Sequence, residues 1–303
     1  MSFPPVSIII PVYNRQDYIA EQLNAISQQI DPPAFEVLIC DNGSTDETIK
    51  IAENYAADFP IKIIDASQKR GVSYARNKGA QEARGELLLF CDSDDIVDAS
   101  WCREMYLAYQ KFPHSIFAGF ADVKTVNRPE ILRAYKIDPI EAPDDYILDP
   151  VGFQKYLPTI AGCNFALPKT IYIEVGGSDE SYLDGSEDTD LAWRVQEAGN
   201  KLISVPQARV FYRLRSTPRE IGKQTYHYEK NEVLLWVRFG KKIQGPSFKY
   251  SLRKVLVLSP QYFIPSRKLN VARELGGNIG SLMGTIQYRV LKQIPRRQLM
   301  KTK

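Results

Sequence analysis

The chain has 303 residues, 44% of them hydrophobic and 25% charged, which is ordinary for a soluble globular protein and enough for a sizeable core. Two isolated histidines argue against a histidine-based metal site, and four cysteines without CxxC spacing are expected as free thiols in a reducing compartment. A signal-peptide pattern and any run of about 18 apolar residues are absent, so we expect no leader, no membrane-spanning helix and a cytoplasmic location.

Charge is unevenly divided along the chain. The stretch from Arg238 to Lys303 carries 15 lysines and arginines and a single acidic residue, Glu274, whereas the first 237 residues carry 24 basic and 35 acidic residues. An acidic body therefore bears a strongly basic tail, and this asymmetry predicts a separate packing or binding role for the tail.

Strands and helices alternate through the first 100 residues. Apolar residues at helical spacing predict a helix over Tyr18–Gln29, and Ser44 followed by Glu47 matches a capping box that would start a second helix. A third helix is expected after Gly71. Short apolar runs predict the strands between them, at Ser7–Ile10, Glu36–Cys40, Ile61–Asp65 and Glu86–Cys91. This alternation is typical of right-handed βαβ units and a parallel sheet.

Polar residues follow the carboxyl ends of three of these strands. They are the turn Pro11–Arg15, the single carboxylate Asp41 and the run Asp92–Asp95. In open α/β sheets ligands bind at this edge. Three polar clusters converging on one edge therefore predict a binding site.

The stretch from about residue 101 to residue 215 has a less regular pattern. A helix is expected over Trp101–Lys111 and a strand after it, and Asn127–Pro158, rich in Pro and Asp, is expected to be an extended surface loop. A helix that opens near Glu187 and ends at Gly199 precedes two expected strands, "KLISV" and "ARVFYRLR".

The sequence "LLLFCDSDDIV" places Asp92, Asp94 and Asp95 at the end of a strand that is expected to be buried. Carboxylates repel one another there unless positive charge is close. Asp-x-Asp at a strand end suits a hard divalent cation that is shared with the phosphates of a nucleotide. Alone the pair also fits a solvated acidic turn, but its place beside the other strand-end clusters favours a metal.

Each of the other candidates also has an ordinary structural explanation. Asp41 could bind a base or a ribose, but "DNGSTD" equally fits an Asx turn. Arg76 and Asn77 could reach a pyrophosphate, or could lie on an exposed helix face. Asp188 could be a general base whose proton affinity is raised by neighbouring carboxylates, or could, with Glu187, simply charge the start of a helix.

These residues together resemble the family 2 glycosyltransferases, inverting enzymes with the GT-A fold, a Rossmann-like α/β fold that binds nucleotide-diphospho-sugars. Four matching stretches run in the family's order between Val6 and Gly199, namely "VSIIIPVYNRQDYIAEQLNAISQQ", "FEVLICDNGSTDETIKIAENY", "GVSYARNKGAQEARGELLLFCDSDD" and "GSEDTDLAWRVQEAG". The resemblance implies a nucleotide-sugar-binding half (1–100) and an acceptor-binding half (101–215). It leaves a basic, mainly helical C-terminal extension (216–303).

The resemblance implies a role for each matching position. Asp188 is the implied catalytic base, and Glu187 and Trp193 would lie on the acceptor side. Asp92 and Asp94 would hold Mn²⁺ or Mg²⁺, with Asp94 the more direct ligand. The positions implied to bind the nucleotide-sugar are Pro11, Tyr13, Asn14, Arg15, Asp41, Gly71, Arg76, Asn77, Asp92, Ser93 and Asp94.

One departure from the family pattern concerns the metal. Members often carry a histidine near the stretch that here is "VFYRLR", where Phe211 and Tyr212 stand instead. A third protein ligand is therefore in doubt, and Arg213 or Arg215 would supply positive charge in its place.

The implied reaction is a hexosyl-type transfer, one sugar at a time, from a nucleotide-diphosphate donor to an acceptor hydroxyl in cell-surface polysaccharide or glycolipid synthesis. The Gln-x-x-Arg-Trp motif of the family's processive synthases is absent. Two alternatives stay open. One is a non-catalytic sugar-nucleotide-binding or scaffold protein. The other is a sugar-1-phosphate nucleotidyltransferase, whose Gly-rich loop ending in Arg is missing from "IIIPVYNRQDY".

The basic tail has three possible roles. It could lie on an anionic membrane through residues 238–303, pack on the acidic body, or bind nucleic acid, for which it has no recognised module. We favour the membrane at its cytoplasmic face and expect no nucleic acid. Gly280 and Gly284 weaken the prediction of a helix in the tail. Five apolar residues would share one face of that helix, namely Ile279, Leu282, Met283, Ile286 and Val290.

Overall fold

The structure, a computed structural model, describes residues 4–137, 156–241 and 246–301. Its centre is one eight-stranded sheet with strand order β3-β2-β1-β4-β7-β6-β8-β5. Strands β3, β2, β1 and β4 are parallel, whereas β7 is antiparallel to both β4 and β6. The strands are β1 (Val6–Val12), β2 (Phe35–Asp41), β3 (Ile61–Asp65), β4 (Leu87–Cys91), β5 (Ile96–Val97), β6 (Ser115–Asp122), β7 (Asn164–Pro168) and β8 (Lys201–Phe211).

Helices cover both faces of this sheet. In β1, Ile8 and Ile10 pack into one apolar cluster and Ile9 packs into the other, and all three side chains are fully buried. Burial on both faces explains why the strand is a continuous apolar run, and each such side chain contributes about 1.5–3 kcal/mol. The first cluster includes α1 (Ile19–Ser27), α2 (Thr48–Glu53) and α4 (Trp101–Lys111), and the second includes α3 (Val72–Glu82), α6 (Lys169–Glu174) and α7 (Glu187–Glu197).

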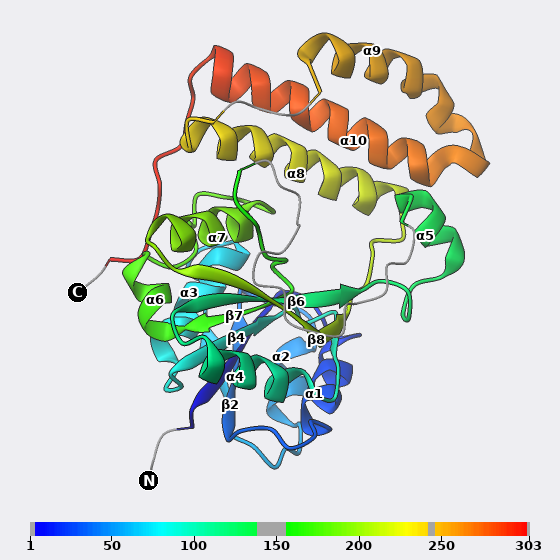
Figure 1. Cartoon of the computed structure of the whole chain (residues 1–303). Coiled ribbons are helices and arrows are strands. Elements are labelled where there is room, and N and C mark those ends of the chain that lie inside the picture. The colour runs from blue at the N-terminus through cyan, green and yellow to red at the C-terminus, as the bar shows by residue number, and fades with distance from the viewer. Residues whose placement is uncertain (1–3, 138–155, 242–245, 302–303) are drawn as a thin grey trace.

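A further layer of helices lies on the α/β body (Figure 1). Its first helix packs on α7 through an apolar cluster in which the rings of Trp193 and Trp236 have centroids 5.2 Å apart. This helix begins with a capping box between Thr217 and Glu220. The layer consists of α8 (Pro218–Arg238), α9 (Phe248–Leu258), the 3₁₀ turns η1 (Ser259–Phe263) and η2 (Pro265–Arg267), α10 (Lys268–Gly284) and the π-helical turn η3 (Thr285–Val290).

Glycines form the contact between α10 and α8. A Cβ on Gly276 would lie 2.1 Å from the carbonyl oxygen of Gly222, and one on Gly280 would lie 2.2 Å from that of Tyr226. The two backbones therefore approach closely, which offsets the roughly 1 kcal/mol that each glycine costs in helix propensity. The expectation that Gly280 and Gly284 weaken the prediction of a helix is wrong, because α10 runs through Gly280 to Gly284 and both glycines lie against α8.

The predicted apolar face of the tail points outward. Since the glycines of α10 face α8, the side chains of Ile279, Met283, Ile286 and Val290 lie on the exposed side. The tail is thus packed on the body through its small residues and presents its large apolar residues to the outside. Among the described residues, no helix is long and apolar enough to cross a membrane.

We expect Gly280→Leu to destabilise the protein by at least about 1–3 kcal/mol, because its side chain would overlap the backbone of Tyr226 in α8. Urea unfolding followed by circular dichroism measures the change. Gly277→Ala is the matched control, since a Cβ there meets only the side chain of Glu229, at 3.3 Å. Equal stability of the Gly280→Leu variant and the control would contradict this packing.

The capping box predicted at Ser44 and Glu47 is wrong. Helix α2 begins at Thr48, and Glu47 forms no side-chain cap. Instead the backbone N–H of Thr48 donates to Oδ1 of Asp46 at 3.1 Å, and the hydroxyl of Ser44 accepts from the backbone N–H of Asn14 at 3.1 Å. Ser44 is thus used to hold the turn after β1 and is not available to cap α2.

Two predictions for the stretch from residue 101 to residue 215 are also wrong in part. Asn127–Pro158 is not a loop throughout, because α5 (Pro129–Tyr135) lies within it, and its residues 138–155 lie outside the described part of the chain. "KLISV" and "ARVFYRLR" do not form two strands, since β8 runs through both up to Phe211. The pairing with β6 jumps from Gly119↔Val205 to Phe120↔Arg209, so Pro206 falls in an unpaired bulge.

The remaining strand predictions in the first 100 residues are confirmed, as is the helix over Trp101–Lys111. All four cysteines are free and buried. One continuous sheet joins residues 1–100 to residues 101–215, so the division of the body into two functional halves stays a prediction.

Candidate active site

The loops after β1 and β2 are tied together at the carboxyl edge of the sheet. The backbone N–H of Arg15 donates to the hydroxyl of Thr48 at 2.7 Å, and Asn14, next to it, has a positive φ of 51°. Asp41 accepts from the backbone N–H of Ser44 at 2.8 Å, so the predicted Asx turn is confirmed. Pro11 is buried within β1, whereas the ring of Tyr13 is exposed.

Asn42, which was not among the predicted site residues, holds the loop between β3 and α3. Its amide nitrogen donates to the carbonyl of Lys69 at 2.8 Å, and its amide oxygen accepts from the N–H of Gly71 at 2.7 Å. Gly71 precedes α3 with a φ of 131°, a conformation that favours glycine. The guanidinium of Arg70 in this loop lies 5.5 Å from the centroid of the Tyr13 ring. The loop therefore flanks an exposed aromatic surface.

Three aspartates form the centre of the site. Each of Asp92, Asp94 and Asp95 offers a carboxylate oxygen, and these oxygens lie within 4.8 Å of one another. Asp94 and Asp95 are buried, as is Ser93 between Asp92 and Asp94. Oδ2 of Asp95 is a buried oxygen with no hydrogen-bond partner. Converging carboxylates with an unpartnered buried oxygen fit a hard divalent cation.

Arginines supply the positive charge that this cluster requires. Arg215 contacts Oδ2 of Asp94 at 2.6 Å, and Arg15 contacts the same oxygen at 3.3 Å. The backbone N–H of Arg213 donates to Asp95 at 2.9 Å, and its side chain donates to the carbonyl of Asp94 at 2.9 Å. The structure thus places both predicted arginines at the cluster, next to Phe211 and Tyr212.

The cluster shifts the proton affinities of its members. Burial, reinforced by the charges of Asp92 and Asp94, raises the pKa of Asp95 to about 9. Burial also raises the pKa of Asp92. Burial acts in the same direction on Asp94, but Arg215 and Arg15 outweigh it and lower the pKa of that carboxyl. Asp94 is therefore the carboxylate most strongly held in its charged form.

Arg76 joins the aspartate cluster to the start of α7. Its guanidinium is buried and contacts Asp92 at 3.2 Å and Glu187 at 3.0 Å. It also donates to the carbonyl of Gly162 at 2.8 Å, and the N–H of Gly162 donates to Oδ2 of Asp188 at 2.9 Å. Gly162 was not predicted, since nothing in its local sequence marks it. One arginine and one glycine therefore fix Asp188 relative to Asp92.

Asp188 is partly buried in the first turn of α7. Its Oδ1 accepts from the backbone N–H of Thr189 at 2.7 Å, and burial raises the pKa of the carboxyl. Asp184 and Ser186, just before the helix, have φ of 61° and 67°. Non-glycine residues in this region are strained and are held there only by surrounding contacts. The backbone therefore turns sharply just before the helical turn that carries Asp188.

The side chains of two predicted site residues make their contacts away from the aspartate cluster. The side chain of Asn77 makes four hydrogen bonds, which involve Tyr172, Ser178 and Glu180, so its polar atoms tie α3 to the segment after α6. Trp193 is buried against Trp236, and its indole N–H donates to the carbonyl of Leu157 at 2.8 Å. The helical layer covers Trp193, and its acceptor-side role stays a prediction. Glu187 is likewise buried, in its pair with Arg76.

Family comparisons match most of the body. A family model described as "Glycosyl transferase family 2" matches residues 7–176, and one described as "N-terminal domain of galactosyltransferase" matches residues 145–217. These matches favour sugar transfer over the nucleotidyltransferase and non-catalytic alternatives.

Curated relatives match parts of the chain. An uncharacterized glycosyltransferase, YfnE of Bacillus subtilis, is 41% identical over 37% of this chain and 29% of its own length. The Staphylococcus aureus poly(ribitol-phosphate) beta-N-acetylglucosaminyltransferase TarS is 38% identical over 30% of this chain and 16% of its own length. A glucosyl-dolichyl phosphate glucuronosyltransferase of Haloferax volcanii is 22% identical over 84% of this chain and 79% of its own length. The chain thus spans less than a third of the two relatives with the higher identity.

Solved structures share the fold over nearly the whole chain. TarS 1–349 of S. aureus in complex with UDP-GlcNAc has a TM-score of 0.59 at 17% identity and covers 94% of this chain and 91% of its own. A mannosyltransferase from Pyrobaculum calidifontis in complex with GDP-Man and Mn²⁺ has a TM-score of 0.60 at 17% identity and covers 93% and 88%. At such identities the likeness shows a common fold and no more.

Proposed function

The chain belongs to glycosyl transferase family 2 and has the GT-A fold, and on that basis we propose that it transfers one sugar from a nucleotide-diphosphate donor to an acceptor hydroxyl with inversion. The observation that carries the proposal is the bridge through Arg76 and Gly162, which sets Asp188 beside the aspartate cluster. A proton acceptor and a set of oxygens for a metal then lie on one edge of the sheet.

The donor is proposed to lie across the turn after β1 and the loops after β2 and before α3. Tyr13 offers an exposed ring and Asp41 a carboxylate at this edge, and Asn42, the residue after Asp41, binds the N–H of Gly71. Arg15 and Arg76 bring positive charge toward a diphosphate. The solved neighbours with UDP-GlcNAc and GDP-Man support a nucleotide-diphospho-sugar as the donor class.

Asp92 and Asp94, with Asp95 beside them, would hold Mn²⁺ or Mg²⁺. When bound, such an ion supplies positive charge that stabilises a departing diphosphate. Arg215 and Arg15, both in contact with Asp94, add positive charge from the chain itself. The Mn²⁺ named with the mannosyltransferase structure supports this choice of metal.

Asp188 is the proposed general base. Its carboxylate takes the proton from the acceptor hydroxyl, whose oxygen attacks the anomeric carbon from the face opposite the leaving group. Because burial raises the pKa of Asp188, the carboxylate is a stronger base than an exposed aspartate. Gly162 and Thr189 donate to its two oxygens and fix its orientation.

The acceptor class is proposed from the relatives. TarS is named for transfer to poly(ribitol-phosphate), and the H. volcanii enzyme for a dolichyl phosphate-linked sugar. We accordingly place this chain in cell-surface polysaccharide or glycolipid synthesis. Residues 1–100 would bind the donor and residues 101–215 the acceptor.

A thermal-shift screen tests the donor site. The melting temperature is measured with UDP, GDP, CDP, ADP and dTDP, each with and without MnCl₂. One base is expected to raise it, and only with the metal, since a ligand at 100 times its Kd stabilises by about 2.7 kcal/mol. No rise with any nucleotide in either condition would contradict the proposal.

The outer surface of the helical layer is proposed to bind an anionic membrane. Phe263, Leu256 and Val290 are 83%, 69% and 67% exposed on this layer. Lysines and arginines interleave with them, and Glu274 is the one acidic residue from Arg238 to Lys303. Apolar insertion and attraction of about 1 kcal/mol per basic residue act together at such surfaces. This location would bring the site to lipid-linked acceptors at the cytoplasmic face.

Vesicle flotation tests the membrane proposal. The protein should float with phosphatidylcholine vesicles that contain about 30% phosphatidylglycerol and much less with phosphatidylcholine alone, and NaCl at about 0.5 M should weaken binding. Phe263→Glu with Leu256→Glu should abolish it. Leu107→Glu, at an exposed apolar residue of α4 in the body, is the control and should change little. Flotation indifferent to anionic lipid and to salt would remove the proposal.

A further inference from the structure

The last described residues return from the helical layer to the α/β body. Figure 1 shows the chain running from the end of the layer down past α7 toward α6. We call residues 295–300 the C-terminal strap. Its main chain is bonded to the body, because the N–H of Met300 donates to the carbonyl of Gly176 at 2.8 Å and that of Glu180 donates to the carbonyl of Gln298 at 3.1 Å.

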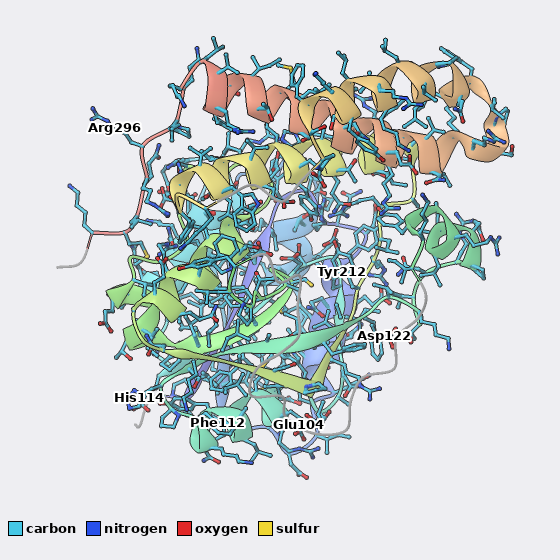
Figure 2. The ribbon with its side chains drawn as sticks, turned by 45° about the horizontal axis from the view of Figure 1, so that its top comes forward. Glu104, Phe112, His114, Asp122, Tyr212 and Arg296 are labelled. Carbon is cyan, nitrogen blue, oxygen red and sulfur yellow. The ribbon has the colours of Figure 1, made fainter. Side chains whose placement is uncertain are left out.

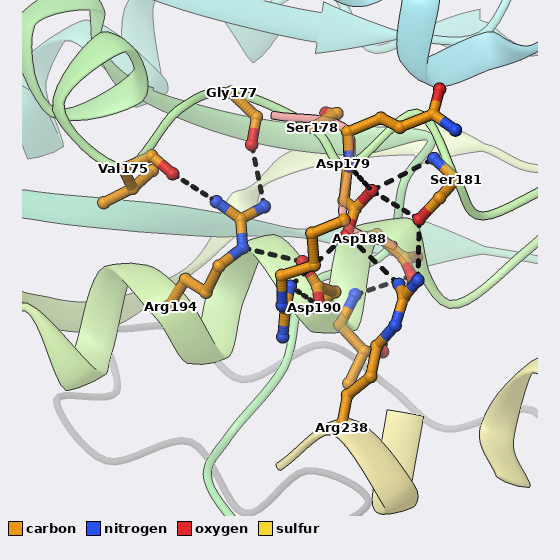
Figure 3. A network of polar contacts seen from close by, with 12 residues as sticks. Val175, Gly177, Ser178, Asp179, Ser181, Asp188, Asp190, Arg194 and Arg238 are labelled. Atoms are coloured by element: carbon orange, nitrogen blue, oxygen red, sulfur yellow. Dashed lines mark hydrogen bonds and ion pairs between the residues drawn. The ribbon is translucent and has the colours of Figure 1, made fainter. Parts of the chain in front are cut away.

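A buried charge cluster lies beneath the strap (Figure 3). Asp179 and Asp190 are both fully buried. Arg194 contacts Asp190 at 2.7 Å, and Arg238 of α8 contacts Asp179 at 3.1 Å. Arg297 of the strap contacts both carboxylates, Asp190 at 2.5 Å and Asp179 at 3.4 Å. A buried carboxylate is costly unless it is paired. Arg194 and Arg238 give each carboxylate one partner, and Arg297 is the cation that bridges the two carboxylates and ties both to the strap.

Arg297 contacts α7 in its first turn, which also carries Asp188. Asp190 lies in the first turn of α7, two residues after Asp188. Its Oδ2 is bound by Arg194 of the same helix, whereas its Oδ1 is bound by Arg297. The preceding residues Asp184 and Ser186 are in left-handed conformations, which need outside contacts to persist. The strap provides such a contact from the far end of the chain.

We infer that Arg297 is a positioning residue: its pairs with Asp190 and Asp179 hold the first turn of α7, and so the carboxylate of Asp188, in place. The strap thereby couples the helical layer to this turn, since Arg238 at the end of α8 also donates to the carbonyl of Pro295 at 2.9 Å. The inference rests on the proposed role of Asp188.

The test compares Arg297→Ala with Arg296→Ala in the full-length chain. Arg296 is exposed and extends away from the body in Figure 2, so its variant controls for the loss of one positive charge. Amide hydrogen exchange of residues 186–191 should speed up by about tenfold or more in Arg297→Ala and stay unchanged in Arg296→Ala. Exchange in the strands of the sheet should stay unchanged in both. Unchanged exchange at residues 186–191 in Arg297→Ala would overturn the inference.

The second readout is catalytic. The release of UDP from UDP-GlcNAc, or of GDP from GDP-mannose, is followed with whichever donor the wild-type protein turns over. In Arg297→Ala, kcat should fall about tenfold while KM for the donor changes less than twofold, and Arg297→Lys should recover part of kcat. Faster exchange with unchanged kcat would also overturn the inference. If Arg297→Ala does not fold, Arg297→Gln takes its place, because the amide keeps part of the side-chain length and removes the charge that pairs with Asp190 and Asp179.

A wild-type protein that turns over no sugar nucleotide, including those of the base that raises its melting temperature, would count against the proposed function alone. The exchange comparison would still decide whether Arg297 holds this turn.

Discussion

Replacing Asp188 with Asn is expected to abolish sugar transfer and to leave donor binding nearly intact. The amide keeps the size of the carboxylate, and its single oxygen can still accept from one of the two N–H groups, those of Gly162 and Thr189, that donate to the carboxylate. It cannot take the proton of an acceptor hydroxyl, and general-base catalysis contributes about 10²–10⁴-fold. Turnover and donor affinity are measured on the same preparation, by nucleotide release and by calorimetry.

The control for this prediction is Asp184→Asn. Asp184 lies in the same loop and has an exposed side chain, and asparagine tolerates its positive φ. Its turnover should match that of the wild type. Preserved turnover in Asp188→Asn, together with lost donor binding, would show that Asp188 binds the donor and is not the general base.

The pH dependence of the wild type offers a second check on Asp188. The reaction requires the charged carboxylate, and burial raises its pKa. Activity should therefore be lost on acidification at a higher pH than the ordinary aspartate value of about 3.9 would give. An acid limb of kcat/KM at or below that value would contradict the assignment.

Replacing Asp94 with Ala should remove metal-stimulated nucleotide binding and activity together. Asp94 is the member of the cluster held charged by Arg215 and Arg15. Its loss removes one of three converging oxygens and leaves both arginines without this partner. We expect nucleotide affinity to become independent of Mn²⁺, which calorimetry with and without the metal measures.

Asp17→Ala is the control for Asp94→Ala, because Asp17 is an exposed carboxylate shortly after β1. It should keep the full metal dependence. A variant at Asp94 whose nucleotide binding still responds to Mn²⁺ as the wild type does would show that the metal, if any, is held elsewhere.

The sequence predicted those parts of the site that depend on local pattern. Apolar runs ending in polar residues located the edge of the sheet, and "DNGSTD" predicted the turn at Asp41. Phe211 and Tyr212 stand where family members often carry a histidine, so Arg213 or Arg215 was expected to supply positive charge instead. Both arginines lie at the aspartates.

Local sequence patterns could not predict contacts between segments that lie far apart in the sequence. Gly162 bonds Arg76 and Asp188 across 86 and 26 positions of sequence, and a glycine in a loop gives no sign of this. Arg297 contacts Asp190 across 107 positions. The packing face of α10 was also missed, because the glycines that look unfavourable in an isolated helix are the residues that contact α8.

The claim on which the proposed reaction rests is that Asp92 and Asp94 hold a divalent cation opposite Asp188. Anomalous diffraction at the manganese edge tests it most directly, on crystals soaked with MnCl₂ and the sugar nucleotide that raises the melting temperature. We expect a manganese peak bonded to both aspartates and to the donor diphosphate, with the Asp188 carboxylate on the open side of the anomeric carbon. A donor bound with no manganese at these aspartates, or with Asp188 turned away from the sugar, would contradict the account.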